Sequence, residues 1–202
     1  MISSIRSAIA AGVDWVQIRE KDLSASHMLA LARAAVLAAY DHRGIQVSSL
    51  RILINDRLDV ALATGAAGVH LGQESMPAAE VVRWCRAGNA PAEFLIGVSC
   101  HSVAEARKAE AAGASYAIFG PIFDTPSKRR FGQPPGVAKL REACGALRIP
   151  VIAIGGVDEH NAGECVRAGA FGIAAIRLFQ EAGDSKSLAE RVATLHELSA
   201  RA

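Results

Sequence analysis

Aromatic residues are scarce in this chain, at 5% of its 202 residues, although hydrophobic residues make up 51%. Such an interior, built mainly from small and branched aliphatic side chains, is more typical of an alanine-rich α/β enzyme than of a β-sandwich. The net charge is also small, at +2, so the composition gives no sign of bulk affinity for nucleic acid or for a membrane surface. A local cluster of cations could still bind a small phosphorylated ligand.

Paired cysteines and long apolar runs are lacking as well. The chain has four cysteines and no CxxC pair: Cys85, Cys100, Cys144 and Cys165. This spacing favours reduced, mostly structural thiols. No secretory signal opens the sequence, and no apolar run is long enough to span a bilayer. We therefore expect one cytoplasmic domain over residues 1–202, as a monomer or a small homo-oligomer, with no membrane or nucleic-acid partner.

A short phrase ending around a glycine recurs where helical stretches give way to apolar runs. It occurs at 10–13, 63–66, 111–114 and 167–170. Glycine suits the left-handed residue that follows a helix, a conformation that other residues enter at a cost. The alternation of helix, glycine corner and apolar run is typical of a parallel α/β protein.

The apolar runs predict strands near 14–19, 51–55, 67–71, 93–99, 116–121, 150–155 and 172–177. Helices are expected near 3–11, 25–40, 57–64, 77–87, 102–112, 136–146, 159–168 and 185–200. Ser24 and Ser102 are candidate N-caps, and Pro77 suits a first helical turn.

The strand count bears on the fold. Eight strands close a (β/α)₈ barrel, and this sequence provides about one fewer. Because residues 1–4 already enter a helix, we expect an α/β protein of the (β/α)8 TIM-barrel type that lacks its first strand at the N-terminus. A doubly wound sheet is the alternative, but polar residues at the ends of nearly all the strands favour a ring over a single crevice.

The first apolar run ends in cations. Gln17, Arg19 and Lys21 alternate, so on a continuing strand they point to one side. Guanidinium and ammonium groups together suit a polyphosphate. The alternative is a salt-bridged rim in which these cations pair with Glu20 and Asp22.

Two further runs end in residues with acid–base or metal-binding side chains. Asn55 and Asp56 close one of them, and a carboxylate there can hold Mg²⁺ beside phosphate oxygens. Asp56 could instead cap the following helix. His70 alternates with apolar neighbours on the next run, so it is either a site residue or a core histidine with satisfied nitrogens.

The later runs end in features that favour phosphate binding. Gly155 and Gly156 bring bare backbone N–H groups to a strand end, and Ile176 and Arg177 end the last expected strand. A plain tight turn is the other interpretation of the two glycines. The segment 124–136, with cations at 128–130, is long for an α/β connection and is either a lid or a solvated basic loop.

Taken in order, these segments resemble the thiamine phosphate synthase family over about residues 5 to 180. The motifs are VQIREK at 16–21, IND at 54–56, GVHLGQ at 68–73, GVSCHS at 97–102, GPIFDTPSK at 120–128 and AIGG at 153–156. The resemblance implies a transferase that joins a hydroxymethylpyrimidine diphosphate to a thiazole phosphate and releases pyrophosphate.

The resemblance also implies roles for individual residues and a Mg²⁺ cofactor. Arg19, Lys21, Lys128 and Ser99 would act on the leaving diphosphate, and Asp56 and position 75 would hold Mg²⁺. The implied substrate-binding residues are Gln17, Arg19, Lys21, Asn55, His70, Ser99, Thr125, Ser127, Lys128, Gly156, Ile176 and Arg177.

Three positions depart from the pattern of the family. Ser75 stands where a second metal-binding Asp is usual, and Arg177 stands where Ser is usual. Pro121 stands where tautomerase relatives carry a catalytic histidine, which counts against that activity. Two alternatives stay open: a thiazole phosphate tautomerase-like isomerase, and a non-catalytic regulatory protein that binds thiamine phosphates.

Overall fold

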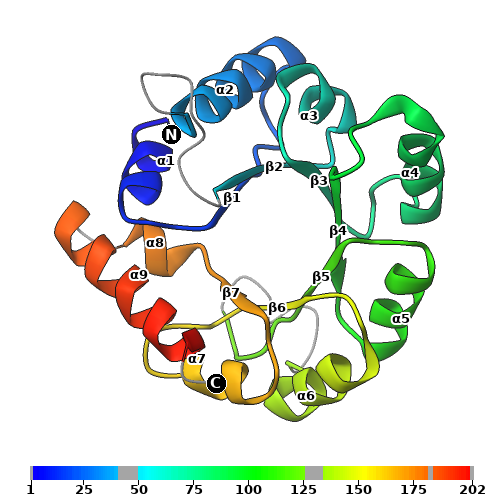
Figure 1. The fold of residues 1–202 in the computed structure, drawn as a ribbon. Coiled ribbons are helices and arrows are strands. Elements are labelled where there is room, and N and C mark those ends of the chain that lie inside the picture. Colours follow the sequence, from blue (N-terminus) through cyan, green and yellow to red (C-terminus); the bar gives the residue numbers. More distant parts are fainter. Residues whose placement is uncertain (1, 41–49, 126–133, 182–183, 201–202) are drawn as a thin grey trace.

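A computed structural model of the chain describes all residues except 1, 41–49, 126–133, 182–183 and 201–202. Its strands form one parallel seven-stranded sheet in chain order, β1 to β7, and the helices lie outside that sheet (Figure 1). The strands are β1 (Trp15–Ile18), β2 (Arg51–Asn55), β3 (Gly68–Leu71), β4 (Leu95–Cys100), β5 (Tyr116–Phe119), β6 (Val151–Ile154) and β7 (Gly172–Ala174).

The helices follow the strands in regular alternation. They are α1 (Ile2–Ala10), α2 (Ala25–Ala38), α3 (Leu58–Thr64), α4 (Ala78–Trp84) with the π-helical turn η1 (Cys85–Asn89), α5 (Val103–Ala111), α6 (Gly136–Ala146), α7 (Ala162–Arg167), α8 (Arg177–Gln180) and α9 (Ser185–Ala200). Within the described part of the chain, no helix is long and apolar enough to cross a membrane.

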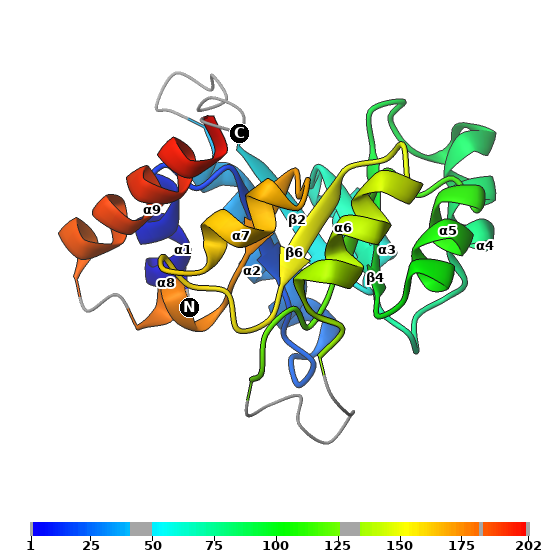
Figure 2. The ribbon, with the colours of Figure 1, turned by 90° about the horizontal axis from the view of Figure 1, so that it is seen from below.

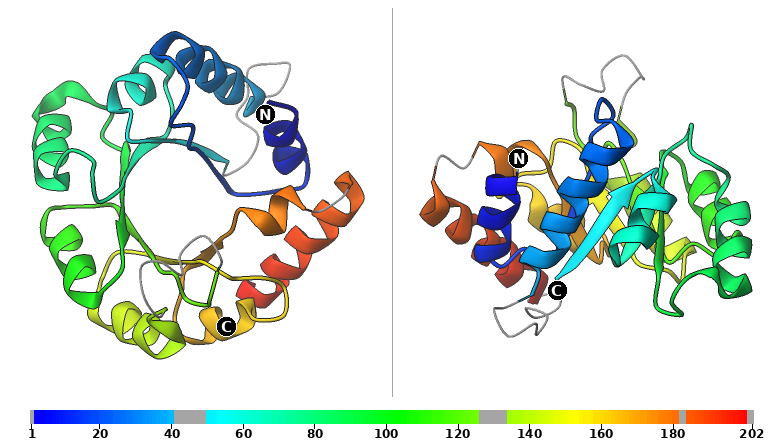
Figure 3. Two further views of the ribbon diagram at one scale, coloured as in Figure 1. Left: turned by 180° about the vertical axis from the view of Figure 1, so that it is seen from behind. Right: turned by 90° about the horizontal axis from the view of Figure 1, so that it is seen from above.

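The sheet curls into a barrel wall that is open between β1 and β7. Each strand pairs with the next along the chain, and no pairing joins β7 to β1 among the described residues. On this open side α9 lies beside α1, as the views along and across the barrel show (Figures 1, 2 and 3). The expectation of a TIM-type barrel with one strand too few is confirmed. The doubly wound alternative is wrong, because the strand order never reverses.

The repeated glycine corners behave as the sequence predicts. Gly12, Gly65, Gly113 and Gly169 all have positive φ, at 87°, 67°, 90° and 98°. Each follows a helix and turns the chain toward a strand, so one local device builds four of the connections. The two predicted serine caps are also present, because Ser24 and Ser102 accept hydrogen bonds from the backbone N–H groups of His27 and Glu105.

Two strand ends differ from the prediction. β1 stops at Ile18, so Arg19 and Lys21 follow the strand and their expected alternation along it does not apply. β7 stops at Ala174, and Arg177 begins the short helix α8 rather than ending the last strand. The apolar character of Ile176 is misleading there, because its side chain is 58% exposed.

Alternate residues of each strand face the inside of the barrel. On β3, Val69 and Leu71 pack outward into the layer between sheet and helices, while His70 faces inward. The inner cluster contains Leu53, Tyr116, Ile118 and Ile152, which seal the interior below the carboxyl ends of the strands. Polar residues with the same parity at those ends therefore face one shared space.

The Tyr116 ring lies over Gly97 of the neighbouring strand β4, its partner in the sheet register, where there is no side chain. A Cβ at Gly97 would lie 2.0 Å from the Cζ atom of Tyr116, far inside contact distance. Trp15 packs against the same ring edge-on, with centroids 4.9 Å apart and an interplanar angle of 74°. Gly97 thus provides the space that the Tyr116 ring occupies.

We predict that Gly97→Ala lowers the free energy of unfolding by about 1–3 kcal/mol, because the buried ring must shift to admit a methyl group. Urea denaturation measures the change. Gly145→Ala is the matched control: it lies in α6 with no atom within 4 Å of the new Cβ. That change is expected to stabilise the protein by about 0.5–1 kcal/mol. Equal effects of the two substitutions would contradict the close approach at Gly97.

Candidate active site

The carboxyl ends of β1 and β2 are joined by a chain of side-chain hydrogen bonds. Gln17 Nε2 donates to Asn55 Oδ1 at 2.9 Å, and Asn55 Nδ2 donates to Asp56 Oδ2 at 2.6 Å. Asn55 is buried, so both halves of its amide are used by neighbours that the fold provides. The predicted convergence of Gln17, Asn55 and Asp56 is present in the structure.

Asp56 extends this chain toward the loop after β3. Its Oδ1 accepts the hydroxyl of Ser75, and the Ser75 Oγ in turn accepts the backbone N–H of Gly72 at 2.6 Å. The Asp56 backbone has a positive φ of 62°, which is uncommon for a residue other than glycine. The alternative role of Asp56 as a helix cap is wrong: Arg57 is the N-cap of α3 and makes no side-chain cap.

His70 and Ser99 form a second polar group on β3 and β4. His70 Nε2 lies 2.8 Å from Ser99 Oγ, and His70 Nδ1 lies 3.2 Å from the Tyr116 hydroxyl. His70 is 2% exposed, whereas Ser99 is half-buried at the rim of the interior. Both imidazole nitrogens are therefore used within the protein, and Ser99 is the member of the group that faces the site.

Burial makes the imidazole of His70 a weak base. Desolvation lowers its pKa to about 4; the Asp56 carboxylate opposes this shift and the charge of Arg19 adds to it. The effect of both charges on one buried ring shows that Arg19, Asp56 and His70 share the same region. At neutral pH the imidazole is uncharged.

Arg19 and Lys21 are exposed and follow β1 directly. In the described part of the chain, no ion pair joins either cation to Glu20 or Asp22, so the rim of paired charges that was the alternative is wrong. Among the described residues, these two cations lack an ion-paired carboxylate at the carboxyl end of β1. Such a pair of cations suits an anionic ligand with several oxygens.

The turn after β6 places a series of peptide groups in a fixed orientation. The carbonyls of Ile154, Gly155 and Gly156 accept hydrogen bonds from Ile122 N, Phe123 N and Asn161 Nδ2, each at 2.9 Å. These peptide bonds are trans, so in each peptide group the N–H points in the direction opposite to the C=O. The N–H groups of the residues that follow each of the three carbonyls therefore point away from the hydrogen-bond donors that those carbonyls contact.

The two glycines of this turn are also required by packing. A Cβ at Gly155 would lie 2.6 Å from Pro121 Cα, and a Cβ at Gly156 would lie 2.8 Å from the Asp124 carbonyl oxygen. The segment after β5 therefore runs directly over the turn after β6, and the buried Thr125 follows it. The two interpretations of these glycines, a tight turn and a candidate phosphate site, therefore apply to the same segment of the chain.

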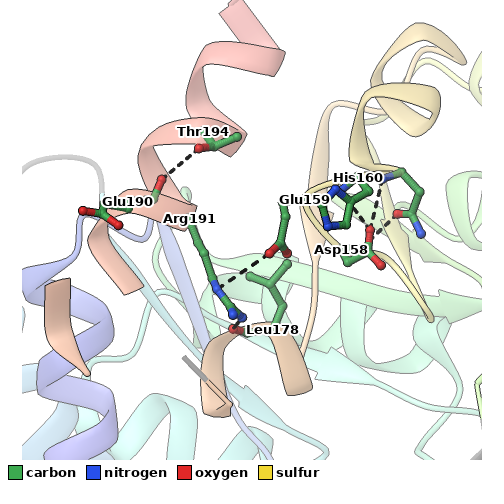
Figure 4. A network of polar contacts seen from close by, with 8 residues as sticks. Asp158, Glu159, His160, Leu178, Glu190, Arg191 and Thr194 are labelled. Atoms are coloured by element: carbon green, nitrogen blue, oxygen red, sulfur yellow. Dashed lines mark hydrogen bonds and ion pairs between the residues drawn. The ribbon is translucent and has the colours of Figure 1, made fainter. Parts of the chain in front are cut away.

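Arg191 on α9 ties α8 to the loop before α7. Its Nη1 donates to the Leu178 carbonyl at 2.9 Å, and its Nε lies 3.9 Å from Glu159 Oε1 (Figure 4). In the same loop, Asp158 Oδ1 accepts the N–H of His160 at 2.9 Å. These contacts hold Ile176 and Arg177, at the start of α8, near the Gly-Gly turn side of the barrel.

Sequence reasoning missed Tyr116, Asn161 and Arg191, which support site residues from distant positions. The glycine at position 97, inside a strand, is a sequence sign that another group approaches closely there, but it does not identify Tyr116 as that group. Ser127 and Lys128, together with most of the expected lid, lie outside the described residues. A cavity of about 450 Å³ lies at the opposite, amino-terminal side of β4, lined by Cys85, Arg86 and Phe94 among others, and is remote from these groups.

The donor set at Asp56 fits a metal that arrives with its substrate. Among the described residues, no group of three His, Cys, Asp or Glu side chains could hold a metal ion. One carboxylate and the adjacent Ser75 hydroxyl are present instead. Mg²⁺ is commonly bound by one or two carboxylates plus phosphate oxygens and water, so this pair suits a Mg²⁺–diphosphate complex.

The fold and this site define an α/β-barrel protein of the class that binds phosphorylated small molecules at the carboxyl ends of its strands. The family model "Thiamine monophosphate synthase" matches residues 1–179, and the chain belongs to that family. The match spans all seven strands described above and all the motifs quoted from the sequence.

Curated relatives and a solved structure agree with this assignment. The chain is 38% identical over 188 residues to the thiamine-phosphate synthase of Moorella thermoacetica, covering 93% of this chain and 84% of that one. It is 39% identical over 176 residues to the thiamine-phosphate synthase of Roseiflexus castenholzii, covering 87% and 72%. The thiamine phosphate pyrophosphorylase structure from Pyrococcus furiosus superposes with a TM-score of 0.83 at 28% identity, covering 98% of this chain and 90% of that one.

The depressed pKa of His70 predicts that stability falls in acid. The pKa of His70 is 6.5 in the unfolded chain and about 4 in the folded protein, so between these pH values the folded protein binds fewer protons. The free energy of unfolding therefore rises with pH through this window and reaches its full value above it. We expect the wild type to lose about 2–3 kcal/mol between pH 7 and 4.5 from this group alone. Urea denaturation of the wild type and of His70→Asn at both pH values measures this contribution of His70. The same pH dependence of the unfolding free energy in both proteins would contradict the prediction.

Proposed function

We propose that this protein is a Mg²⁺-dependent thiamine phosphate synthase. Its substrates would be 4-amino-2-methyl-5-hydroxymethylpyrimidine diphosphate and thiazole phosphate. The observation that carries the proposal is the hydrogen-bonded series at the ends of β1 and β2, from Gln17 through Asn55 to Asp56, with the exposed cations Arg19 and Lys21 directly after β1. That combination suits a diphosphate and is expected of a member of this family.

In the reaction, the bond between the pyrimidine methylene carbon and the diphosphate oxygen breaks, and its electron pair leaves with pyrophosphate. The thiazole nitrogen provides the electron pair for the new C–N bond. The chief requirement is stabilisation of the negative charge that grows on the leaving group. Arg19, Lys21 and Lys128 would provide positive charge, and Ser99 would donate a hydrogen bond. Gln17 and Asn55 would hold the pyrimidine diphosphate in place.

The thiazole phosphate would lie at the other side of the barrel mouth. Thr125, Ser127 and the backbone at Gly156 would bind its phosphate, with Ile176 and Arg177 completing the pocket. The ordered peptide groups of the Gly-Gly turn support this assignment, because N–H groups aimed away from their own carbonyl partners are suitable donors for phosphate. Arg177 would add a cation at a position where the family pattern implies Ser.

When bound, Mg²⁺ would neutralise charge on the leaving diphosphate. Asp56 would ligate it, with Ser75 as a neutral oxygen ligand in place of a second carboxylate. The proposal also places the enzyme in the cytoplasm, because Cys85, Cys100, Cys144 and Cys165 are all free thiols.

The direct test is formation of thiamine phosphate from the two purified substrates, with and without Mg²⁺. Metal-dependent product supports the synthase. Absence of product from a folded protein that still binds thiazole phosphate would favour a binding protein, and conversion of the thiazole isomer alone would favour the tautomerase. Pro121, where tautomerases of the family carry histidine, makes the last outcome the less expected one.

We predict that Arg19→Ala and Lys128→Ala each reduce turnover at least tenfold, because a lost contact to the diphosphate costs about 1.5–3 kcal/mol. Steady-state rates at saturating Mg²⁺ measure the effect. Arg83→Ala is the control: this arginine lies on the outer helix α4 and pairs with Glu80 on the protein surface. Normal turnover in both site variants would reject the assigned diphosphate site.

We also predict that Ser75→Asp lowers the Mg²⁺ concentration needed for half-maximal activity, because it adds a second carboxylate beside Asp56. Ser75→Ala should leave that concentration unchanged or raise it, since only a neutral oxygen is lost. Activity is titrated with Mg²⁺ for the three proteins. An unaltered titration in the Asp variant, with the fold intact, would mean that the metal is held elsewhere.

A further inference from the structure

Tyr116 is the innermost member of a three-residue series that ends at the substrate side of the barrel. Its hydroxyl lies 3.2 Å from His70 Nδ1, and His70 Nε2 lies 2.8 Å from Ser99 Oγ. The Tyr116 and His70 rings are stacked, with centroids 5.7 Å apart, and both residues are almost completely buried. Only Ser99 borders the space where a substrate would lie.

The hydrogens of this series can be arranged in two ways. A neutral imidazole carries one N–H, on either Nδ1 or Nε2. In the first arrangement Tyr116 donates to Nδ1 and Nε2–H donates to Ser99, whose own hydrogen is left for the site. In the second, Nδ1–H donates to Tyr116 and the Ser99 hydroxyl donates inward to Nε2.

The surroundings of the tyrosine distinguish the two arrangements. In the described part of the chain, His70 Nδ1 is the acceptor that the Tyr116 hydroxyl reaches. The second arrangement would leave the buried tyrosine proton without an acceptor, which is costly in a nonpolar interior. The Tyr116 ring packs against Trp15 and fills the space over Gly97, so its position is fixed. The hydroxyl therefore stays within reach of His70 Nδ1.

We propose that Tyr116 is a positioning residue that fixes the Nε2–H tautomer of His70 and so makes Ser99 a hydrogen-bond donor toward the leaving diphosphate. The proposal rests on the assignment of Ser99 to the diphosphate site described above. Diphosphate oxygens only accept hydrogen bonds, so a serine whose proton points inward would offer them lone pairs instead. The orientation of the Tyr116 hydroxyl thereby determines whether Ser99 presents a hydrogen-bond donor or a lone pair to the leaving diphosphate.

The effect should grow as the reaction proceeds. Negative charge accumulates on the diphosphate while the C–O bond breaks, so a donor to that group stabilises the transition state more than the bound substrate. We therefore expect Tyr116→Phe to lower kcat about tenfold and to change the KM for the pyrimidine diphosphate less. Phenylalanine retains the ring that fills the space at Gly97, so packing is largely preserved.

The first measurement needs no turnover. Nitrogen-15 NMR of the histidine side chains in the free protein, assigned with a His70→Asn variant, reports which nitrogen of His70 carries hydrogen. The expected result is a protonated Nε2 and an unprotonated Nδ1 in the wild type, and a mixture of tautomers in Tyr116→Phe. A hydrogen on Nδ1 in the wild type would overturn the proposal whether or not the protein is a synthase.

The second measurement is a double-mutant cycle with Ser99→Ala. If Tyr116 acts through Ser99, its substitution should have little further effect on kcat once the serine hydroxyl is gone. Equal losses in the two backgrounds would mean that Tyr116 has only a structural role and would refute the proposal. Ile118→Val, in the same inner cluster but without a polar atom, is the control for loss of packing. Absence of all turnover in the wild type would count against the proposed function and leave the NMR result to decide the tautomer.

Discussion

The requirement that every polar group inside the barrel has a partner governs the arrangement of this site. Among the described residues, no buried side-chain nitrogen or oxygen is left without a hydrogen bond. Asn55 meets the requirement through Gln17 and Asp56, and His70 meets it through Tyr116 and Ser99. These side chains are therefore held in one orientation before any substrate arrives, which is the condition for stabilising charge without reorganisation.

The balance of charge at the site follows from the same residues. Asp56 is the carboxylate that the hydrogen-bonded series holds at the end of β2, and its oxygens accept from Asn55 and Ser75. Among the described residues, neither Arg19 nor Lys21 forms an ion pair with a carboxylate. A diphosphate would interact with these two cations. Because Asp56 and Ser75 provide one carboxylate and one hydroxyl, much of the coordination of Mg²⁺ would come from the substrate. With Ser75 in place of a second carboxylate, the cations of the chain would neutralise more of the diphosphate charge and a resident metal less.

Much of this architecture could be predicted from the sequence, because it depends on local patterns. Glycine corners mark the ends of helices through their positive φ, and apolar runs mark buried strands. The order of polar strand ends then places Asn55 and His70 on neighbouring strands. The end of β7 could not be predicted, since Ile176 is apolar but exposed. The contact of Tyr116 with His70 joins residues 46 positions apart and depends on the space at Gly97, which no local pattern reveals.

The chemistry of the groups that face the site favours stabilisation of a leaving anion over abstraction of a proton. His70 is the histidine that the sequence offers as a site residue, but its nitrogens are both hydrogen-bonded and burial lowers its pKa to about 4. A general base that works near neutrality has a pKa near the working pH and a free nitrogen within reach of the substrate. An isomerase would need such a group, whereas a reaction in which pyrophosphate departs needs donors and cations. Gln17, Ser99, Arg19 and Lys21 are groups of that kind.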